Sequence, residues 1–377
     1  MELSSQRPAL DADFLPTAPL ENLRLRAEML RRLREFFHDR GFLEVETPIL
    51  SDDTVVDRHL DPFSLTLTDA AGKPRRTLWL QTSPEFSMKR LLAAGAKAIY
   101  QVSRVFRQGE QGRLHNPEFT LVEWYRVGDT PEEGMQLTSN LCETLLTGPN
   151  KTGTGTSRQT VSPGPARIGS EPVPVLLGPV SGGSGTRSVP TTGATERLTY
   201  QAAFLRHVGL DPHTAPVETL MAAARACDSP PPESLSPEDR DGWLDWLLTE
   251  RVQPHLGVGR PTLLCDYPAS QAALARVRPG NPPVAERFEL YVDGIELANG
   301  YHELLDASEL RQRNARANVQ RQADGKQPLP EESRLLAAME AGLPPAVGVA
   351  LGFDRVVMLA AGASSVAEVI AFPFDRA

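Results

Sequence analysis

The segment from Tyr100 to Tyr125 reads YQVSRVFRQGEQGRLHNPEFTLVEWY. Apolar and polar residues alternate in its first part, and a second alternation begins at Phe119, after a polar loop. A period of two is the period of a β-strand, whose successive side chains point to opposite faces. The pattern therefore predicts two antiparallel strands joined by a long loop.

Charged residues mark one surface of this predicted strand pair. Arg107 ends the first strand, and Glu123 shares a face with Tyr125 on the second. A guanidinium suits a phosphate because its donors form a bidentate fork, and a carboxylate suits a substrate ammonium. Taken alone, the segment is also explained by a surface salt bridge.

A second predicted strand pair lies near the other end of the chain. Residues 288–292 and 295–299 flank Asp293 and Gly294, which predict a two-residue hairpin turn because both positions need a positive φ. Tyr291 then pairs with Glu296, so Glu289 and Glu296 point to the same side. Two carboxylates there would suit Mg²⁺, which prefers oxygen ligands. The alternative is a solvated sheet face.

The start and the end of the chain add two further elements. Residues 22–38 predict an amphipathic helix, whose apolar face holds Leu23, Ala27, Leu30, Leu33 and Phe37. Gly41 stops this helix, and residues 42–48 alternate as a short strand that ends at Pro48. Near the C-terminus, residues 347–355 predict a strand that runs into a helix.

Composition narrows the class of protein. The 377 residues are 40% hydrophobic and 23% charged, which is ordinary for a globular protein. The sequence has no apolar run long enough to span a bilayer and no signal-peptide pattern. We therefore expect a cytoplasmic protein with no membrane contact. Three dispersed cysteines suggest neither disulfides nor a zinc site. The net charge of -9 argues against a dedicated nucleic-acid binder.

Residues 148–195 differ from the rest of the chain. Gly, Ser, Thr and Pro dominate this stretch, which holds almost no aromatic residues and cannot bury enough apolar surface to order itself. We predict a flexible insertion within one catalytic domain that spans residues 1–377.

Several common active-site motifs are absent. The sequence contains no GxxxxGK[ST] phosphate loop, no GxGxxG after a strand and no GxSxG elbow. His302 and Glu303 begin a sequence that differs from HExxH because Asp306 stands at the second histidine position, which argues against a zinc peptidase. A nucleotide, if bound, is held in another way.

Three segments, in order, resemble the signature motifs of class II aminoacyl-tRNA synthetases of the lysyl type. Residues 41–48 resemble motif 1. Phe106 and Arg107, together with residues 115–125, resemble motif 2, and residues 352–355 resemble motif 3. Residues 294–304 are similar to the lysine-site segment of this subgroup. The resemblance implies an α/β (α+β) fold, with a mixed, mostly antiparallel sheet flanked by helices.

The resemblance also implies a set of site residues. Arg107 and Arg355 would be catalytic, and ATP would be bound by Arg107, Glu110, Asn116, Glu296, Leu297, Gly352 and Arg355. Mg²⁺ would be held by Glu289 and Glu296. The amino-acid pocket would be lined by Ser83, Glu85, Glu123, Tyr125, Asn299 and Glu303, because buried carboxylates offset the desolvation of an ammonium group.

Two positions depart from the family pattern. Members often carry Glu two positions after the motif 2 arginine, where this chain has Gly109, and the nearest acid is Glu110. Strict alternation also places Asn299 and Glu303 on the opposite face from Glu296, so a bulge or a strand end between Glu296 and Asn299 must redirect the chain.

The chain is most similar in layout to the elongation factor P lysine ligases. Lysyl-tRNA synthetases resemble this core with an added anticodon-reading OB-fold, for which the residues before the first predicted helix leave no room. The resemblance implies a homodimer that uses ATP and Mg²⁺ to attach lysine or (R)-β-lysine to a lysine of elongation factor P. Ala298 and Ala350, where lysyl-tRNA synthetases usually have glycine, are expected to reshape the amino-acid pocket. The alternatives are tRNA charging, which we consider unlikely, and an inactive synthetase-like regulatory protein.

We expect deletion of residues 150–193 to leave adenylation and thermal stability nearly unchanged. A segment of low apolar content contributes little packing, and the entropy of closing a loop changes only slowly with its length. Lysine-dependent pyrophosphate exchange and a thermal melt test this expectation. Loss of adenylation in the deletion variant would contradict a passive insertion.

Overall fold

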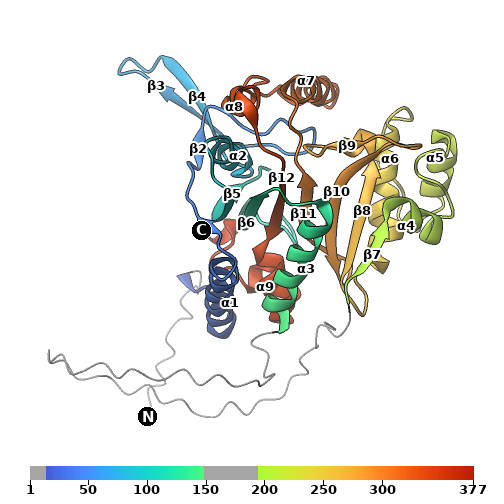
Figure 1. The fold of residues 1–377 in the computed structure, drawn as a ribbon, viewed down its shortest axis with the longest axis horizontal. Coiled ribbons are helices and arrows are strands. Elements are labelled where there is room, and N and C mark those ends of the chain that lie inside the picture. Colours follow the sequence, from blue (N-terminus) through green and yellow to red (C-terminus); the bar gives the residue numbers. More distant parts are fainter. Residues whose placement is uncertain (1–13, 148–193) are drawn as a thin grey trace, which may run out of the picture.

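The computed structural model describes residues 14–147 and 194–377 (Figure 1). Its centre is a sheet in the strand order β1-β5-β6-β12-β11-β10-β8-β7, with β9 paired to β10. In this sheet, β1 runs parallel to β5 and β7 to β8, and the remaining pairs are antiparallel. Helices flank both faces, which confirms the predicted α/β (α+β) fold with a mixed, mostly antiparallel sheet.

The elements have the following bounds. The strands are β1 (Leu43–Glu44), β2 (Leu50–Ser51), β3 (Ser64–Thr68), β4 (Pro74–Leu80), β5 (Ala98–Phe106), β6 (Glu118–Val127), β7 (Glu196–Thr199), β8 (Thr262–Pro268), β9 (Val277–Arg278), β10 (Val284–Val292), β11 (Ile295–His302) and β12 (Ala346–Gly352). The helices are α1 (Leu20–His38), α2 (Glu85–Ala93), α3 (Pro131–Thr147), α4 (Tyr200–His207), α5 (Val217–Arg225), α6 (Arg240–Leu247), α7 (Ala307–Ala323), α8 (Arg334–Gly342) and α9 (Phe353–Ala360).

One face of the central sheet packs on α1, α3 and α9. Residues of β6, β12, β11 and β10 that point to this face are apolar, and they bury against Leu33 and Phe37 of α1, Leu141 of α3 and Val357 of α9. The aromatic ring of Phe37 stacks on that of Tyr100 with centroids 4.4 Å apart. This face is therefore a continuous hydrophobic core.

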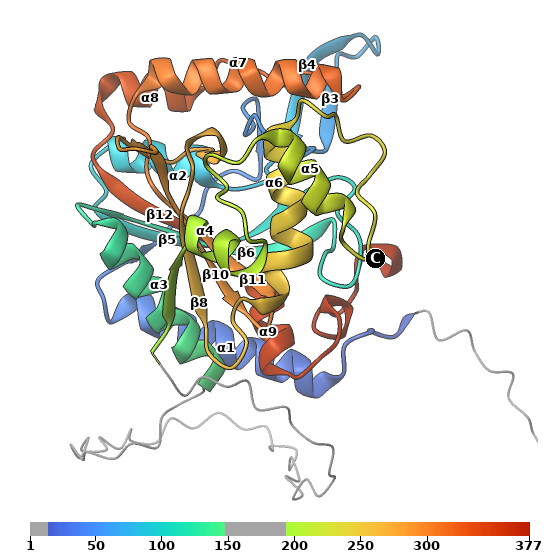
Figure 2. The ribbon, with the colours of Figure 1, turned by 90° about the vertical axis from the view of Figure 1, so that its right-hand side faces the viewer.

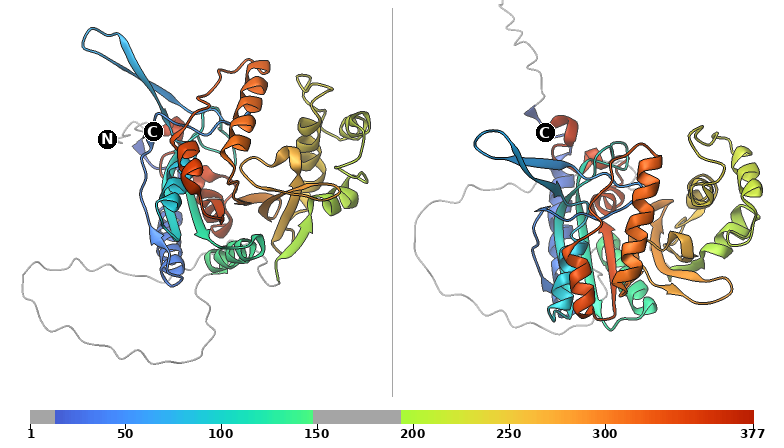
Figure 3. Two further views of the ribbon diagram at one scale, coloured as in Figure 1. Left: turned by 45° about the horizontal axis from the view of Figure 1, so that its top comes forward. Right: turned by 90° about the horizontal axis from the view of Figure 1, so that it is seen from above.

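The opposite face is apolar at its two ends and polar between them. At one end, α4, α5 and α6 cover β7 and β8 through residues such as Phe204, Leu244 and Leu264. At the other end, α2 and α8 pack near β5 and β6, with Ile99 and Tyr125 in the contact. The two helical groups lie on either side of the central strands when the molecule is turned (Figures 2 and 3). The strands between them carry the predicted site residues.

The N-terminal prediction is correct in outline and wrong in detail. The first helix is α1, and it ends before Gly41, which has a φ of +73°. Ala27 is exposed, whereas Met29 and Phe36, which we did not place on the apolar face, are buried. The helix packs against α3 and α9 at once, so its buried stripe is shifted from the predicted one. The predicted strand over residues 42–48 is paired only at Leu43 and Glu44.

A small sheet of β2, β4 and β3 stands beside the main one. Its β3–β4 ribbon projects from the body of the molecule (Figure 1), and all five residues of β3 are exposed. The predicted insertion at 148–195 lies outside the described residues, except for Ala194 and Thr195. None of the helices in the described part of the chain combines the length and apolar character that crossing a bilayer requires.

Candidate active site

A row of paired residues crosses the polar middle of the sheet. Gln101 of β5 pairs with Glu123 of β6, which pairs with Ala350 of β12. Ala350 pairs with Asn299 of β11, and Asn299 pairs with Glu289 of β10. Residues directly opposite one another in a sheet share a face. The pairing therefore brings Glu123, Asn299 and Glu289, which are far apart in the sequence, onto one surface.

A β-bulge in β11 explains how Glu296 joins this surface. Tyr291 pairs with Glu296 and Leu290 pairs with Ala298, so Leu297 has no partner of its own on β10. The extra residue reverses the alternation. Glu296 and Asn299 therefore share the face of Glu289, and of the two possibilities left open by the sequence, the bulge is the correct one. The turn itself is as predicted, with φ of 48° at Asp293 and 73° at Gly294.

The same bulge corrects the expectation for Ala298. Its side chain is 2% exposed and lies in the hydrophobic core on the face covered by α1, α3 and α9. Ala298 therefore does not line the amino-acid pocket. Ala350 does belong to the polar row, between Glu123 and Asn299, so only this second alanine is placed to reshape the pocket.

Glu289 is deeply buried and already accepts three hydrogen bonds, which leaves acceptor capacity on its carboxylate. It accepts hydrogen bonds from Arg287 at 2.5 Å, Tyr291 at 2.5 Å and Asn299 at 3.0 Å. The Arg287 guanidinium lies 4.5 Å from the centre of the Tyr267 ring. This environment excludes the alternative of a solvated sheet face for Glu289.

Glu296 makes fewer contacts than Glu289, so its carboxylate is more available to a ligand. It is half-buried, and its carboxylate lies 3.8 Å from Arg355. Desolvation, and after it the negative charge of Glu289, raises the pKa of Glu296 to about 7. A cation between the two carboxylates would relieve this repulsion, so the donor set fits Mg²⁺. No cluster of three or more His, Cys, Asp or Glu suited to a metal occurs among the described residues. Mg²⁺ in proteins usually binds one or two carboxylates, and phosphate oxygens and water fill its other positions.

The predicted amino-acid pocket is buried and acidic. Glu123 is 1% exposed and accepts hydrogen bonds from Ser83 at 2.5 Å and Tyr125 at 2.9 Å. Burial, and next the charge of Glu85, raises the pKa of Glu123 to about 7. Gly348 leaves the space that Glu303 and Tyr125 occupy, since a Cβ there would lie 2.1 Å from a Glu303 oxygen. Three carboxylates therefore converge on one pocket.

Sequence reasoning missed a fourth charged residue in this pocket. Lys89 of α2 is 2% exposed and forms ion pairs with Glu85, at 2.5 Å, and with Glu303. The available signal was the spacing of Glu85 and Lys89, which are four residues apart and so lie on one helix face. Lys89 supplies a single positive charge against three carboxyl groups, and burial raises the pKa of Glu123 to about 7 and that of Glu303 to about 8. An ammonium group bound beside them would favour their ionised forms.

The two arginines lie to one side of the polar row, along the strand direction, where β5 and β12 end. Arg107 follows β5, its guanidinium lies 5.0 Å from the centre of the Phe119 ring, and it lies 3.5 Å from Glu110. Arg355 donates to the backbone carbonyls of Leu114 and Glu296 at 3.2 and 2.9 Å. The side chains of Arg107 and Arg355 are 23% and 22% exposed, so both guanidiniums are partly accessible to solvent.

His115 is a second residue that sequence reasoning passed over. Its Nε2 lies 2.7 Å from Arg355, and burial, followed by the charge of Arg355, lowers its pKa. Arg107 contributes to the same lowering, so His115 lies within electrostatic reach of both arginines. Its place inside motif 2, directly before Asn116, was the only signal for it.

Among the other residues predicted to bind the nucleotide, Leu297 faces the core and Asn116 is already hydrogen-bonded. The side chain of Leu297 is buried in the core, and its carbonyl oxygen lies near Gly352. Asn116 donates to the carbonyl of Glu118 at 2.6 Å and accepts from the amide of Phe374 at 2.9 Å. Asn116 therefore braces the motif 2 loop against the C-terminal segment, with one amide hydrogen left for a ligand.

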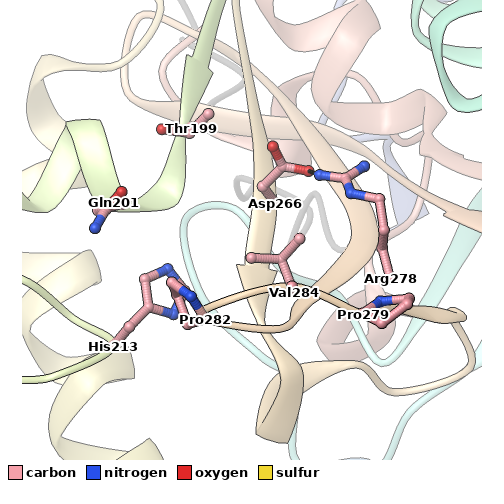
Figure 4. Close-up of a pocket in the computed structure, with 9 residues that line it drawn as sticks. Thr199, Gln201, His213, Asp266, Arg278, Pro279, Pro282 and Val284 are labelled. Atoms are coloured by element: carbon pink, nitrogen blue, oxygen red, sulfur yellow. Dashed lines mark hydrogen bonds and ion pairs between the residues drawn. The ribbon is translucent and has the colours of Figure 1, made fainter.

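A separate cavity lies away from this surface. It has a volume of about 190 Å³ and is lined by residues of β8, β9 and β10 and the neighbouring loops, among them His213, Asp266 and Arg278 (Figure 4). Arg278 and Asp266 are ion-paired at 2.8 Å. The cavity shares no residue with the polar row or the acidic pocket, so we do not assign it to the active site.

Comparison with known proteins identifies the class that this fold and site define. The family of class II tRNA synthetases for Asp, Lys and Asn matches residues 10–376, and the chain belongs to this family. Elongation factor P–(R)-β-lysine ligase from Klebsiella pneumoniae (strain 342) is 44% identical over 366 residues, which cover 97% of this chain and 99% of the relative. The proteins of the same name from Histophilus somni (strain 2336) and Salmonella typhi are 41% and 43% identical, over 98% and 97% of this chain and 100% and 99% of theirs.

Proposed function

We propose that this protein is an ATP-dependent ligase that adenylates lysine or (R)-β-lysine and transfers it to a lysine side chain of translation elongation factor P. The observation that carries the proposal is the polar row, which lies between a buried acidic pocket and a pair of arginines on one face of the sheet. The names of relatives that match almost the whole chain support the choice of amino acid and acceptor. We place the enzyme in the cytoplasm, where translation factors act.

In the first step, the carboxylate of the amino acid attacks the α-phosphorus of ATP, and pyrophosphate leaves. Glu123 and Glu303 bind ammonium groups of the amino acid, and Asn299 lies beside them in the row. Arg107 contacts the α-phosphate and stabilises the charge that develops there. Arg355 and the backbone at Gly352 and Leu297 bind the adenosine and the terminal phosphates. Glu289 and Glu296 would hold Mg²⁺, which would supply positive charge to neutralise the phosphates.

In the second step, the ε-amine of the acceptor lysine attacks the carbonyl carbon of the adenylate, and AMP leaves. With an ordinary lysine pKa of about 10.4, freeing this amine at pH 7 costs about 4.6 kcal/mol. Desolvation of the ammonium at the interface between the two proteins lowers that cost, because a low dielectric favours the neutral amine.

Incubation of the protein with ATP, with lysine or (R)-β-lysine, and with either elongation factor P or tRNA tests the proposal. Mass spectrometry should show one added aminoacyl group on elongation factor P and none on tRNA. The Arg107→Ala variant is the control for background acylation. Charged tRNA would favour the synthetase alternative, and no product with either acceptor and no pyrophosphate exchange would favour an inactive regulatory protein.

We expect Glu289→Gln and Glu296→Gln to raise the Mg²⁺ concentration that gives half-maximal adenylation. Each change replaces a charged oxygen ligand with a neutral one. Titration of Mg²⁺ in the pyrophosphate exchange assay measures the shift, and Glu286→Gln, on the same strand, is a matched control. Unchanged Mg²⁺ dependence in both variants would remove the two carboxylates from the metal site.

We also expect the protein to be a homodimer with twofold symmetry. Motif 1 and the neighbouring small sheet of β2, β4 and β3 expose large apolar side chains, which are Leu43, Ile49, Leu50, Leu65 and Leu67. An exposed apolar surface of this kind is typical of an interface, and a twofold contact buries it against its own copy. Light scattering at micromolar concentration measures the mass, and a monomer would contradict the expectation.

A further inference from the structure

The side chain of Arg26 reaches from α1 to the start of α9. One of its terminal nitrogens donates to Asp354 at 2.5 Å, and the other donates to the hydroxyl of Thr120 at 2.6 Å. Its guanidinium also lies 5.1 Å from the centre of the Phe353 ring. The side chains of Arg26 and Asp354 are 13% and 5% exposed, so this ion pair is nearly excluded from water. Arg26 therefore connects three elements at one buried point.

Asp354 fastens the first turn of α9 to β6. One carboxylate oxygen takes the bond from Arg26, and the other accepts the backbone N–H of Thr120 at 2.8 Å. The helix has only eight residues, and its N-cap residue, Gly352, has no side chain to cap it. A short helix without a side-chain cap depends on other contacts to hold its first turn in place. Here those contacts are made by Asp354.

Arg355 is the next residue of the same turn and points to the candidate site. Its guanidinium is placed by the carbonyls of Leu114 and Glu296 and by His115. Asp354 and Arg355 are consecutive residues of one helix turn, and their side chains point about 100° apart. A shift of the backbone at Asp354 therefore moves Arg355 as well. The orientation of Arg355 is thus tied to the contacts of Arg26.

We infer that Arg26 is a positioning residue for nucleotide binding, which acts through Asp354 to hold Arg355 toward ATP. The inference rests on the proposed function, because it takes Arg355 as a nucleotide-binding residue. None of the hydrogen bonds or ion pairs of Arg26 in the described chain involves the amino-acid pocket, whose charged residues lie on α2, on β6 beyond Thr120 and after β11. Loss of Arg26 should therefore impair ATP use selectively.

Steady-state pyrophosphate exchange with Arg26→Met and Arg26→Lys tests this inference. Arg26→Met should raise the KM for ATP by about 10-fold. Losing a residue that orients a ligand-binding side chain typically weakens binding by about this factor. The KM for the amino acid should stay unchanged. Arg26→Lys keeps the charge beside Asp354 but cannot bridge to Thr120, so its KM for ATP should lie between those of Arg26→Met and the wild type. Arg34→Met is the matched control, since Arg34 lies on the same helix and pairs with Glu44 at the surface.

The outcomes separate a positioning role from a merely structural one. All assays are run well below the melting temperature of each variant, and if Arg26→Met does not fold, Arg26→Lys carries the test. Folded variants with a wild-type KM for ATP, or with equal rises for ATP and the amino acid, would overturn the inference. Arg355→Ala is measured alongside. If it leaves the KM for ATP unchanged, the proposed nucleotide site itself is wrong; if it raises the KM and the Arg26 variants do not, only the role of Arg26 fails.

Discussion

Arg107→Ala should lower the rate of adenylation by about 10² or more, as expected for the loss of one preorganised donor to a transition state. The contact between Arg107 and the α-phosphate strengthens as charge builds up on that group, so the loss should appear in kcat more than in the KM for ATP. The side chain is already ordered by the Phe119 ring and by the carbonyl of Thr82, at 3.3 Å, before any nucleotide binds. Lysine-dependent pyrophosphate exchange measures this step without an acceptor.

Arg104→Ala is a suitable control for this prediction. Arg104 lies on β5, three residues before Arg107, and its ion pair with Glu118 at 3.7 Å is exposed to solvent. An exposed pair of this kind contributes at most about 1 kcal/mol to stability. The control should therefore keep the wild-type rate. A wild-type rate in Arg107→Ala itself would mean that the phosphate site lies elsewhere.

The second large effect concerns Glu123 and the amino-acid pocket. Glu123→Gln should raise the KM for the amino acid by about 10- to 100-fold, because a hydrogen bond to a charged group is worth roughly 1.5–3 kcal/mol. Glutamine keeps the volume, and its one oxygen can accept from Ser83 or Tyr125 while its NH2 group donates to the other hydroxyl oxygen, so the fold should persist. The test compares the KM values for lysine and for ATP in the exchange assay, and only the first should change.

The pKa of Glu123 adds a pH dependence to this prediction. Because burial raises the pKa of Glu123 to about 7, the carboxyl is protonated below that pH and cannot pair with an ammonium group. The KM for the amino acid should therefore fall as the pH rises through about 7 in the wild-type enzyme. Glu123→Gln should show a high KM and lose the part of this step that belongs to Glu123, while Glu303, whose pKa burial raises to about 8, still titrates in the variant. An equal pH profile in both proteins would exclude Glu123 as the titrating group.

Local sequence patterns were sufficient for most of the secondary structure around the site. The alternation in residues 100–125 predicted β5 and β6, and Asp293 and Gly294 predicted the turn between β10 and β11. The strand and helix near Arg355 also lie where the pattern placed them. These features depend on the period of side chains along one strand and on the φ that a turn needs, and both are properties of neighbouring residues.

The first helix shows where such patterns stop being sufficient. Its existence and its end at Gly41 follow from local periodicity, but the buried positions Met29 and Phe36 do not. A helix that packs on two others, α3 and α9, buries a stripe set by the positions of those helices. That arrangement brings together residues more than a hundred positions apart.

The sequence by itself determined the fold class, the hairpin and the residue types of the site, because strand period, turn chemistry and family motifs are written in contiguous residues. Only the tertiary structure decided which of them share a face. The bulge at Leu297 turns Asn299 toward Glu289 and Ala298 into the core, and a bulge depends on the register of the neighbouring strand. The partners of Lys89 and Arg26 were decided in the same way, because Glu303 and Asp354 reach them from elements distant in the chain.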